Sequence, residues 1–151
     1  MRKRITGMLL GMLMLLLWGC SYTDPVIASL PEYQEKVLYL DDGFQDYTDY
    51  GIYTYDPLDK AVLRENIYLE PVTDVEDIRT YIEDFEKWVE VHRENNSHPE
   101  LVAAYAFDPT IIDSRDYIYI KTKEGLDKFH NYTLYFFDVD TNTLYYFHNN
   151  I

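Results

Sequence analysis

The stretch Val75–Glu94, with the sequence VEDIRTYIEDFEKWVEVHRE, decides the fold predicted for this chain. Its apolar side chains recur at steps of three and four, which is the spacing of one face of an α-helix. That face consists of Val75, Ile78, Tyr81, Ile82, Phe85, Trp88, Val89 and His92. Such a face usually packs on the protein's own sheet, although it can also bind a partner. We therefore expect this helix to supply the core.

Signals at both ends bound the predicted helix. Thr73 and Glu76 have the spacing of a capping box, in which each side chain accepts a hydrogen bond from a backbone N–H of the helix start. Asn95 and Asn96 form a typical stop signal. The helix is therefore predicted to run from Val75 to about Glu94.

Short apolar and aromatic runs on both sides of this helix predict strands. These runs are Lys36–Leu40, Gly51–Tyr55, Asn66–Glu70, Leu101–Phe107, Asp116–Lys121, Tyr132–Val139 and Thr143–His148. Strands, one long helix and then further strands predict an α+β fold, an antiparallel sheet with one long amphipathic helix packed on it. Leu58–Arg64 is expected to add one or two helical turns.

The last two runs are predicted to be a hairpin at the centre of the sheet. Asp140-Thr141-Asn142 separates them, and Asn tolerates the left-handed conformation that such a turn requires. Leu134–Phe137 and Leu144–Phe147 are continuous in apolar and aromatic residues, so both faces of each strand need cover. The order of elements resembles that of cystatin-like and PepSY-like extracytoplasmic domains, a resemblance that concerns the fold alone.

The beginning of the chain has the organisation of a signal peptide. Arg2–Arg4 is positively charged and Ile5–Trp18 is apolar. Fourteen helical residues span roughly 21 Å against about 30 Å of hydrocarbon, so the segment is short for a membrane-spanning anchor. Leu17-Trp18-Gly19-Cys20 resembles the lipobox of bacterial lipoproteins.

The lipobox resemblance implies an address for the protein. Cys20 would be acylated and would hold the protein at the cell membrane, on its extracytoplasmic side. Residues 1–19 would then be the signal peptide, 20–35 a tether and 36–151 a single domain. Cys20 is the only cysteine, so we expect no disulfide and no thiolate ligand in that domain.

The charge balance limits the kinds of partner that the domain is expected to bind. The three charges of residues 1–19 are all positive, so residues 20–151 carry ten basic and 27 acidic side chains, a formal net charge of −17. That sign disfavours binding to nucleic-acid phosphates and to an anionic membrane surface. The charge keeps the domain soluble, and it would also attract cations or a basic partner.

No motif in the sequence specifies a reaction. The four serines after Cys20 lie outside the patterns of nucleophilic serine enzymes, and the three remaining glycines are too far apart for a phosphate loop. The four histidines lack the spacing of a zinc site. Asp138–Asn142 matches the opening of a calcium-binding EF-hand loop, but Thr143 replaces the required Gly, and a hairpin turn is the favoured interpretation. We expect neither a metal nor a cofactor.

The candidate binding site lies in the stretch Tyr39–Asp56, where tyrosines alternate with aspartates. With few aliphatic residues and five aspartates, this stretch is expected to be largely exposed. Exposed tyrosines beside carboxylates can contact sugars, cations or basic peptides. The predicted ligand-binding residues are Tyr39, Asp42, Asp46, Tyr47, Asp49 and Tyr50. The alternative is an edge strand that its aspartates keep soluble.

These observations together favour a membrane-anchored lipoprotein with a non-catalytic binding or accessory domain. Its partner would be a cell-envelope glycan, a cation or a basic protein. Two alternatives stay open: an extracytoplasmic enzyme that uses paired carboxylates on glycans, and a weak calcium or cation binder.

The lipobox yields the first prediction. Cys20→Ala should abolish incorporation of a labelled fatty acid and should release the domain or leave an uncleaved precursor, because Cys20 is the only thiol that can be acylated. Ser21→Ala is the matched control and should keep the label. Unchanged labelling of the Cys20→Ala protein would show that the lipobox assignment is wrong.

Overall fold

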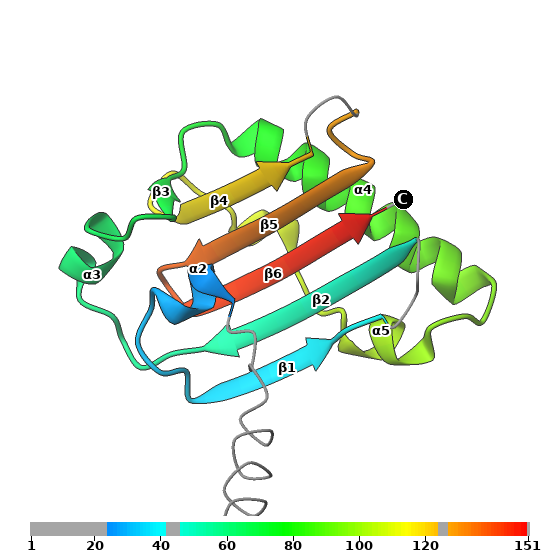
Figure 1. Ribbon diagram of the computed structural model, residues 1–151, viewed down its shortest axis with the longest axis horizontal. Coiled ribbons are helices and arrows are strands. Elements are labelled where there is room, and N and C mark those ends of the chain that lie inside the picture. Colours follow the sequence, from blue (N-terminus) through cyan, green and yellow to red (C-terminus); the bar gives the residue numbers. More distant parts are fainter. Residues whose placement is uncertain (1–23, 42–45, 124–126, 151) are drawn as a thin grey trace, which may run out of the picture.

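Six strands form one antiparallel sheet in the order β1-β2-β6-β5-β4-β3 (Figure 1). The computed structural model describes residues 24–41, 46–123 and 127–150. The strands are β1 Glu35–Tyr39, β2 Tyr47–Thr54, β3 Glu70–Pro71, β4 Tyr117–Thr122, β5 Asn131–Asp138 and β6 Thr143–Asn150. The helices are α2 Pro25–Ala28, α3 Lys60–Arg64, α4 Val75–Glu94 and α5 Pro99–Ala104, with a 3-10 turn η1 at Pro109–Ile111. The predicted α+β fold is confirmed.

The β5–β6 hairpin lies at the centre of the sheet, as its continuous apolar sequence predicts. β6 pairs with β2 on one side and with β5 on the other, and β5 pairs in turn with β4. Asn142 ends the turn with a φ of 53°, in the left-handed region that Asn tolerates. Leu134, Phe136, Phe137, Leu144 and Phe147 are each 0 % exposed.

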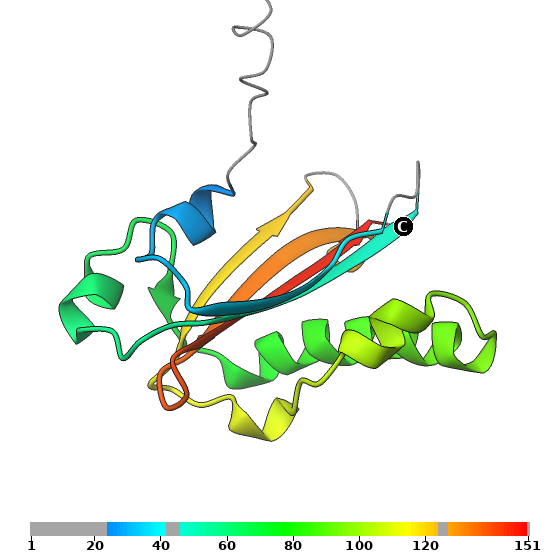
Figure 2. The ribbon, with the colours of Figure 1, turned by 90° about the horizontal axis from the view of Figure 1, so that it is seen from below.

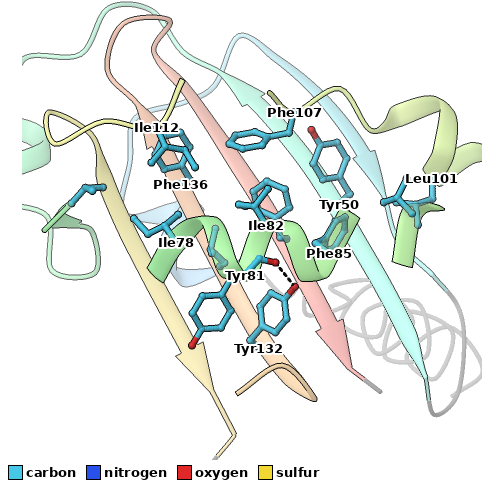
Figure 3. Packing of buried hydrophobic residues seen from close by; sticks show 14 residues of the cluster. Tyr50, Ile78, Tyr81, Ile82, Phe85, Leu101, Phe107, Ile112, Tyr132 and Phe136 are labelled. Carbon is cyan, nitrogen blue, oxygen red and sulfur yellow. Dashed lines mark hydrogen bonds between the residues drawn. The ribbon is translucent and has the colours of Figure 1, made fainter. Parts of the chain in front are cut away.

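α4 covers one face of this sheet and forms the main core (Figures 2 and 3). Ile78, Tyr81, Ile82, Phe85 and Val89 are buried, as the helical spacing predicts. The hydroxyl of Tyr132 on β5 donates a hydrogen bond of 3.0 Å to the carbonyl of Tyr81, which ties the helix backbone to the sheet. The predicted amphipathic helix is thus confirmed, with its core role.

The start of α4 differs from the prediction by one residue. Asp74 is the N-cap, and its Oδ1 accepts a hydrogen bond of 2.9 Å from the Asp77 backbone N–H. The expected capping box of Thr73 and Glu76 is therefore wrong. Asp is as good an N-cap as Thr. Asp74, one position after Thr73, accepts the N–H of the residue three positions ahead, as Thr73 was expected to do.

The second face of the sheet is also covered, by α2, α3 and the loops beside them. Ten buried side chains form this second core: Val26, Leu30, Tyr53, Tyr55, Leu63, Leu69, Tyr117, Tyr135, Phe137 and Leu144. Figure 2 shows α2 on the opposite side of the sheet from α4 and α5. Tyrosines contribute four of the ten, because a phenol ring buries a large apolar area.

The structure corrects the expected tether over residues 20–35. Residues 20–23 lie outside the described part, but from residue 24 onward the chain packs on the domain. Asp24 caps α2 by accepting the backbone N–H groups of Val26 and Ile27. Val26 is 2 % exposed and Leu30 is 8 % exposed. The two prolines of the segment suggested a linker, yet Pro25 is the first residue of a helix, a position that suits proline.

Two predicted strands are wrong. Pro99 begins α5 in place of the expected strand Leu101–Phe107, and Leu101 is the residue that this short helix buries. Of the predicted strand Asn66–Glu70, only Glu70 pairs with β4, and the observed strand β3 continues to Pro71. Asn66 prevents an earlier start, because its Oδ1 accepts the backbone N–H groups of Tyr68 and Leu69 and closes a local turn. Among the described helices, none combines the length and apolar character that crossing a membrane requires.

Leu30 tests whether the segment before β1 belongs to the domain. Leu30→Ala should lower the free energy of unfolding by about 2–3 kcal/mol, because it removes a buried side chain from the second core. Ile67→Ala is the control: Ile67 is 82 % exposed, and its removal should change stability by less than about 0.5 kcal/mol. Urea unfolding measures both. If Leu30→Ala is as stable as Ile67→Ala, the segment before β1 is a tether and does not belong to the domain.

Candidate functional site

The last turns of α4 meet one end of the sheet and enclose a pocket of about 120 Å³. We call it the end pocket. Its lining residues come from the β1–β2 connection, the start of β2, α4, the α4–α5 connection and the end of β6. They are Asp41, Asp46, Tyr47, Thr48, Trp88, His92, His98 and Asn150.

A sharp reversal after α4 brings two imidazoles together. Asn96 and His98 have φ values of 51° and 48°. A left-handed conformation costs roughly 1 kcal/mol for a residue with a side chain, and such residues occur often at functional sites. The reversal places the rings of His92 and His98 at 4.5 Å between centroids, although six positions separate them.

Hydrogen bonds fix the orientation of both imidazoles. Nδ1 of His98 lies 2.6 Å from the hydroxyl of Tyr39 at the end of β1. The same nitrogen is 3.7 Å from Oδ2 of Asp41, whose side chain is 9 % exposed. Nδ1 of His92 lies 3.0 Å from Oγ of Ser97. Burial, followed by the nearby His98, lowers the pKa of His92 below its usual 6.5, so its imidazole is neutral at neutral pH.

Aromatic rings form the other part of the end pocket. Tyr47 and Trp88 are both half-buried and line the pocket, so each side chain keeps some accessible surface. The Tyr47 ring contacts His148 of the neighbouring strand, with 5.0 Å between centroids. Trp88 is therefore only partly a core residue, because the last turns of α4 extend beyond the packed centre of the sheet.

The structure places some of the predicted ligand-binding residues at the end pocket and others away from it. Asp46 and Tyr47 line the end pocket, and Tyr39 positions His98 at its edge. Asp42 lies outside the described residues. Asp49 does not line the pocket: it is 8 % exposed, and its Oδ1 accepts the Asp41 backbone N–H at 2.8 Å. Burial raises the pKa of Asp49, and its observed role is to hold the backbone of Asp41.

Tyr50 is not a binding residue, which corrects the prediction. It is 0 % exposed and its ring packs between α4, α5 and β6, against Phe85, Tyr105 and Phe147. The expectation that Tyr39–Asp56 is largely exposed is wrong for the same reason. β2 is an inner strand with both faces covered, so Tyr50 faces the α4 core and Tyr53 faces the second core.

Six lining residues were not among the predicted ligand-binding residues. Asp41 and Thr48 lie inside the predicted stretch Tyr39–Asp56, and the other four lie outside it: Trp88, His92, His98 and Asn150. Trp88 and His92 continue the apolar spacing of α4, which assigned them to the core. The one available signal was the His92–His98 separation across a predicted helix end. It points to a site only when the reversal between them is known.

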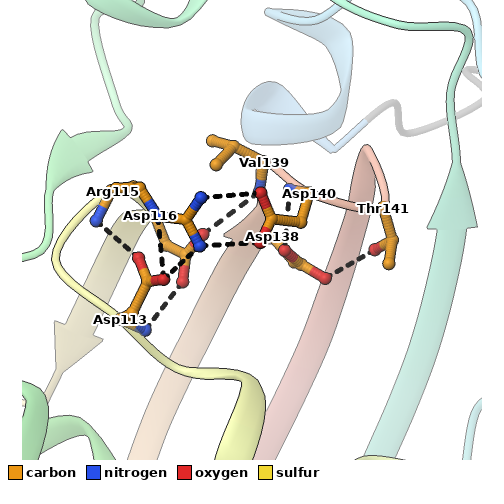
Figure 4. Close-up of polar contacts among 7 residues, drawn as sticks. All are labelled: Asp113, Arg115, Asp116, Asp138, Val139, Asp140 and Thr141. Carbon is orange, nitrogen blue, oxygen red and sulfur yellow. Dashed lines mark hydrogen bonds and ion pairs between the residues drawn. The ribbon is translucent and has the colours of Figure 1, made fainter.

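A second group of acidic residues surrounds the β5–β6 turn (Figure 4). Asp116 is 1 % exposed and accepts the backbone N–H groups of Asp113 at 2.8 Å and of Val139 at 3.1 Å. Asp138 is 3 % exposed and accepts bonds from Asp140 and Thr141. Burial raises the pKa of Asp116 to about 6, with the charges of Asp113 and Asp138 adding to the effect.

These carboxylates hold a turn and do not face an open cleft. Asp138 accepts hydrogen bonds within the β5–β6 turn, and Asp116 joins this turn to the loop before β4. The Asp138–Asn142 segment forms the predicted hairpin turn. In residues 24–41, 46–123 and 127–150, no three His, Cys, Asp or Glu side chains are grouped in a way that could hold a metal ion.

Comparison with known proteins adds no assignment: no family model, curated protein or solved structure matches the chain. The end pocket must therefore be interpreted from its own chemistry.

Asp116 should make stability depend on pH. Its pKa is raised from the usual 3.8 to about 6, so between these values the folded state binds more protons than the unfolded state. The free energy of unfolding should then fall as pH rises through this window, and Asp116→Asn should reduce that slope. Urea unfolding at several pH values measures it.

Thr141→Ala is the matched control for this experiment. It removes a hydrogen bond to Asp138 in the same turn without removing a titrating group. Its stability should fall while its pH slope stays that of the unchanged protein. If Asp116→Asn shows the original slope as well, Asp116 does not titrate in this window.

Proposed function

We propose that this protein is a lipid-anchored, extracytoplasmic binding protein whose end pocket binds one cationic side chain, a lysine or an arginine, of a basic partner. The observation that carries the proposal is the convergence of two aromatic rings and two carboxylates on one small pocket: Tyr47, Trp88, Asp41 and Asp46.

The chemistry of the pocket suits a cation. The faces of Trp and Tyr rings attract ammonium and guanidinium groups, and carboxylates add charge-assisted hydrogen bonds. No Lys or Arg is among the described lining residues. The neutral imidazole of His92 adds no opposing charge at neutral pH, and the net charge of −17 on residues 20–151 attracts a basic partner from a distance.

The size of the pocket favours one side chain over a whole small molecule. Sites for drug-sized ligands usually measure about 300–1,000 Å³. A pocket of about 120 Å³ holds the end of one extended side chain, while the rest of the partner stays on the surface. This favours a protein or peptide over a glycan, and binding over hydrolysis of a sugar chain.

The lipid anchor would determine the place in the cell where the domain binds its partner. Residues 1–20 support acylation at Cys20, which would hold the domain at the outer face of the cell membrane. α2 begins only a few residues after Cys20, so the domain would lie close to the membrane. A basic partner at the cell envelope is the expected ligand, and no reaction is required of the site.

Trp88 supplies the test. In the full chain carrying Trp18→Phe, Trp88 is the only tryptophan, and its fluorescence should change when the peptide acetyl-Ala-Lys-Ala-amide binds. The same peptide with an Nε-acetylated lysine should give no change, because acetylation removes the charge. Tyr47→Ala should weaken binding about two- to fivefold, the value of an exposed cation–π contact.

Matched charge variants separate the end pocket from the general acidity of the chain. Asp46→Asn should weaken binding, whereas Glu32→Gln, which removes one exposed negative charge far from the pocket, should not. Equal responses to the charged and acetylated peptides, or equal weakening by both charge variants, would refute the proposal.

A further inference from the structure

A larger pocket lies at the opposite end of the sheet from the end pocket, between α3 and the β5–β6 turn. We call it the turn pocket. Its volume is about 350 Å³, which is within the range of small-molecule sites. Leu63 and Val139 contribute apolar surface to it. Lys60, Arg64 and Arg115 contribute cationic side chains.

The charge of this pocket is opposite to that of the chain. The protein has 13 basic and 27 acidic residues, yet three of the 13 line this one pocket. Asp140 is the single acidic residue among the described lining residues, and the Arg115 guanidinium already pairs with it at 2.7 Å. Asp113 also pairs with Arg115, so the net positive charge of the lining comes from Lys60 and Arg64.

Arg115 is held in place before any ligand arrives. Its Nε donates to Asp113 at 2.9 Å, and its Nη1 donates to Asp140 at 3.0 Å (Figure 4). Asp116 fastens this loop to the β5–β6 turn by accepting backbone N–H groups from both, those of Asp113 and Val139. The guanidinium is thus fixed between two carboxylates, which compensate its charge and occupy most of its donors.

Lys60 and Arg64 are the available charges. They are four residues apart on α3, and within the described residues neither forms an ion pair. Arg64 lies in the last turn of α3, where a positive charge suits the helix dipole, but Lys60 at the first position gains nothing from the dipole, and like charges at this spacing slightly destabilise a helix. Their ammonium and guanidinium groups are free to bind an anion, for which Arg is well suited.

We infer that the turn pocket binds a phosphate group carried on a compact apolar body. Lys60 and Arg64 would bind the phosphate, the fixed Arg115 would form one wall of the pocket, and Leu63 and Val139 would contact the apolar part. A free phosphomonoester and the headgroup of a phospholipid share this chemistry. The site is independent of the end pocket, because the two lie at opposite ends of the strands.

Two soluble probes distinguish the sources of the phosphate. Phenyl phosphate represents a free phosphomonoester, and dihexanoyl phosphatidylglycerol represents a lipid headgroup. Binding is followed by the backbone amide NMR signals of Leu63 and Asn142 in the full chain. A response to phenyl phosphate assigns a phosphomonoester, and a response to the lipid alone assigns a headgroup. A response to neither probe overturns the inference.

Paired variants test the residues. Lys60→Gln with Arg64→Gln should weaken binding of the responding probe about tenfold, because it removes two charge contacts. Lys121→Gln with Lys123→Gln removes two exposed charges elsewhere and should leave affinity unchanged. An unchanged melting temperature shows that each variant is folded. Equal affinity of the two double variants would overturn the inference.

Discussion

The packing of α4 across β2, β6 and β5 is the interaction on which the rest of the structure depends. Phe85 of α4, Tyr50 of β2 and Phe147 of β6 are each 0 % exposed and contact one another with centroid separations between 5.2 and 6.0 Å. Aromatic contacts of this kind add to the free energy of burial. With no cysteine besides Cys20, the described domain has no disulfide, and its stability comes from this core and the second one.

The same packing positions the two pockets at opposite ends of the sheet. α4 has 20 residues, and its last turns extend past the packed centre of the sheet, where Trp88 and His92 meet the start of β2. The opposite end is closed by the β5–β6 turn and by α3, which brings Lys60 and Arg64 to Arg115. An acidic, aromatic pocket and a cationic pocket are thereby held apart on one rigid sheet, so two ligands of opposite charge could bind without competing.

Much of the fold could be predicted from local patterns, because α4 and the central hairpin carry strong ones. The spacing from Ile78 to Val89 predicted the helix, and the apolar run from Leu134 to Phe137 predicted a central strand. Composition gave the wrong exposure for β2, because tertiary contacts decide which of its side chains are buried. The aspartates of β2 suggested an exposed strand, but Asp49 accepts a backbone N–H and Tyr50 packs in the core. The apolar residues after Pro99 predicted a strand, whereas Pro99 itself suits the first position of a helix.

The candidate site was predicted only in part, for a physical reason. Asp46 and Tyr47 were found because they are close in sequence, whereas Trp88, His92 and His98 reach them through the length of α4 and the reversal after it. The most direct test is the position of a bound lysine side chain. In a complex with acetyl-Ala-Lys-Ala-amide, intermolecular NOEs should connect the lysine ε-methylene protons to the rings of Trp88 and Tyr47. NOEs from those protons to other surfaces alone would contradict the end pocket as the cation site.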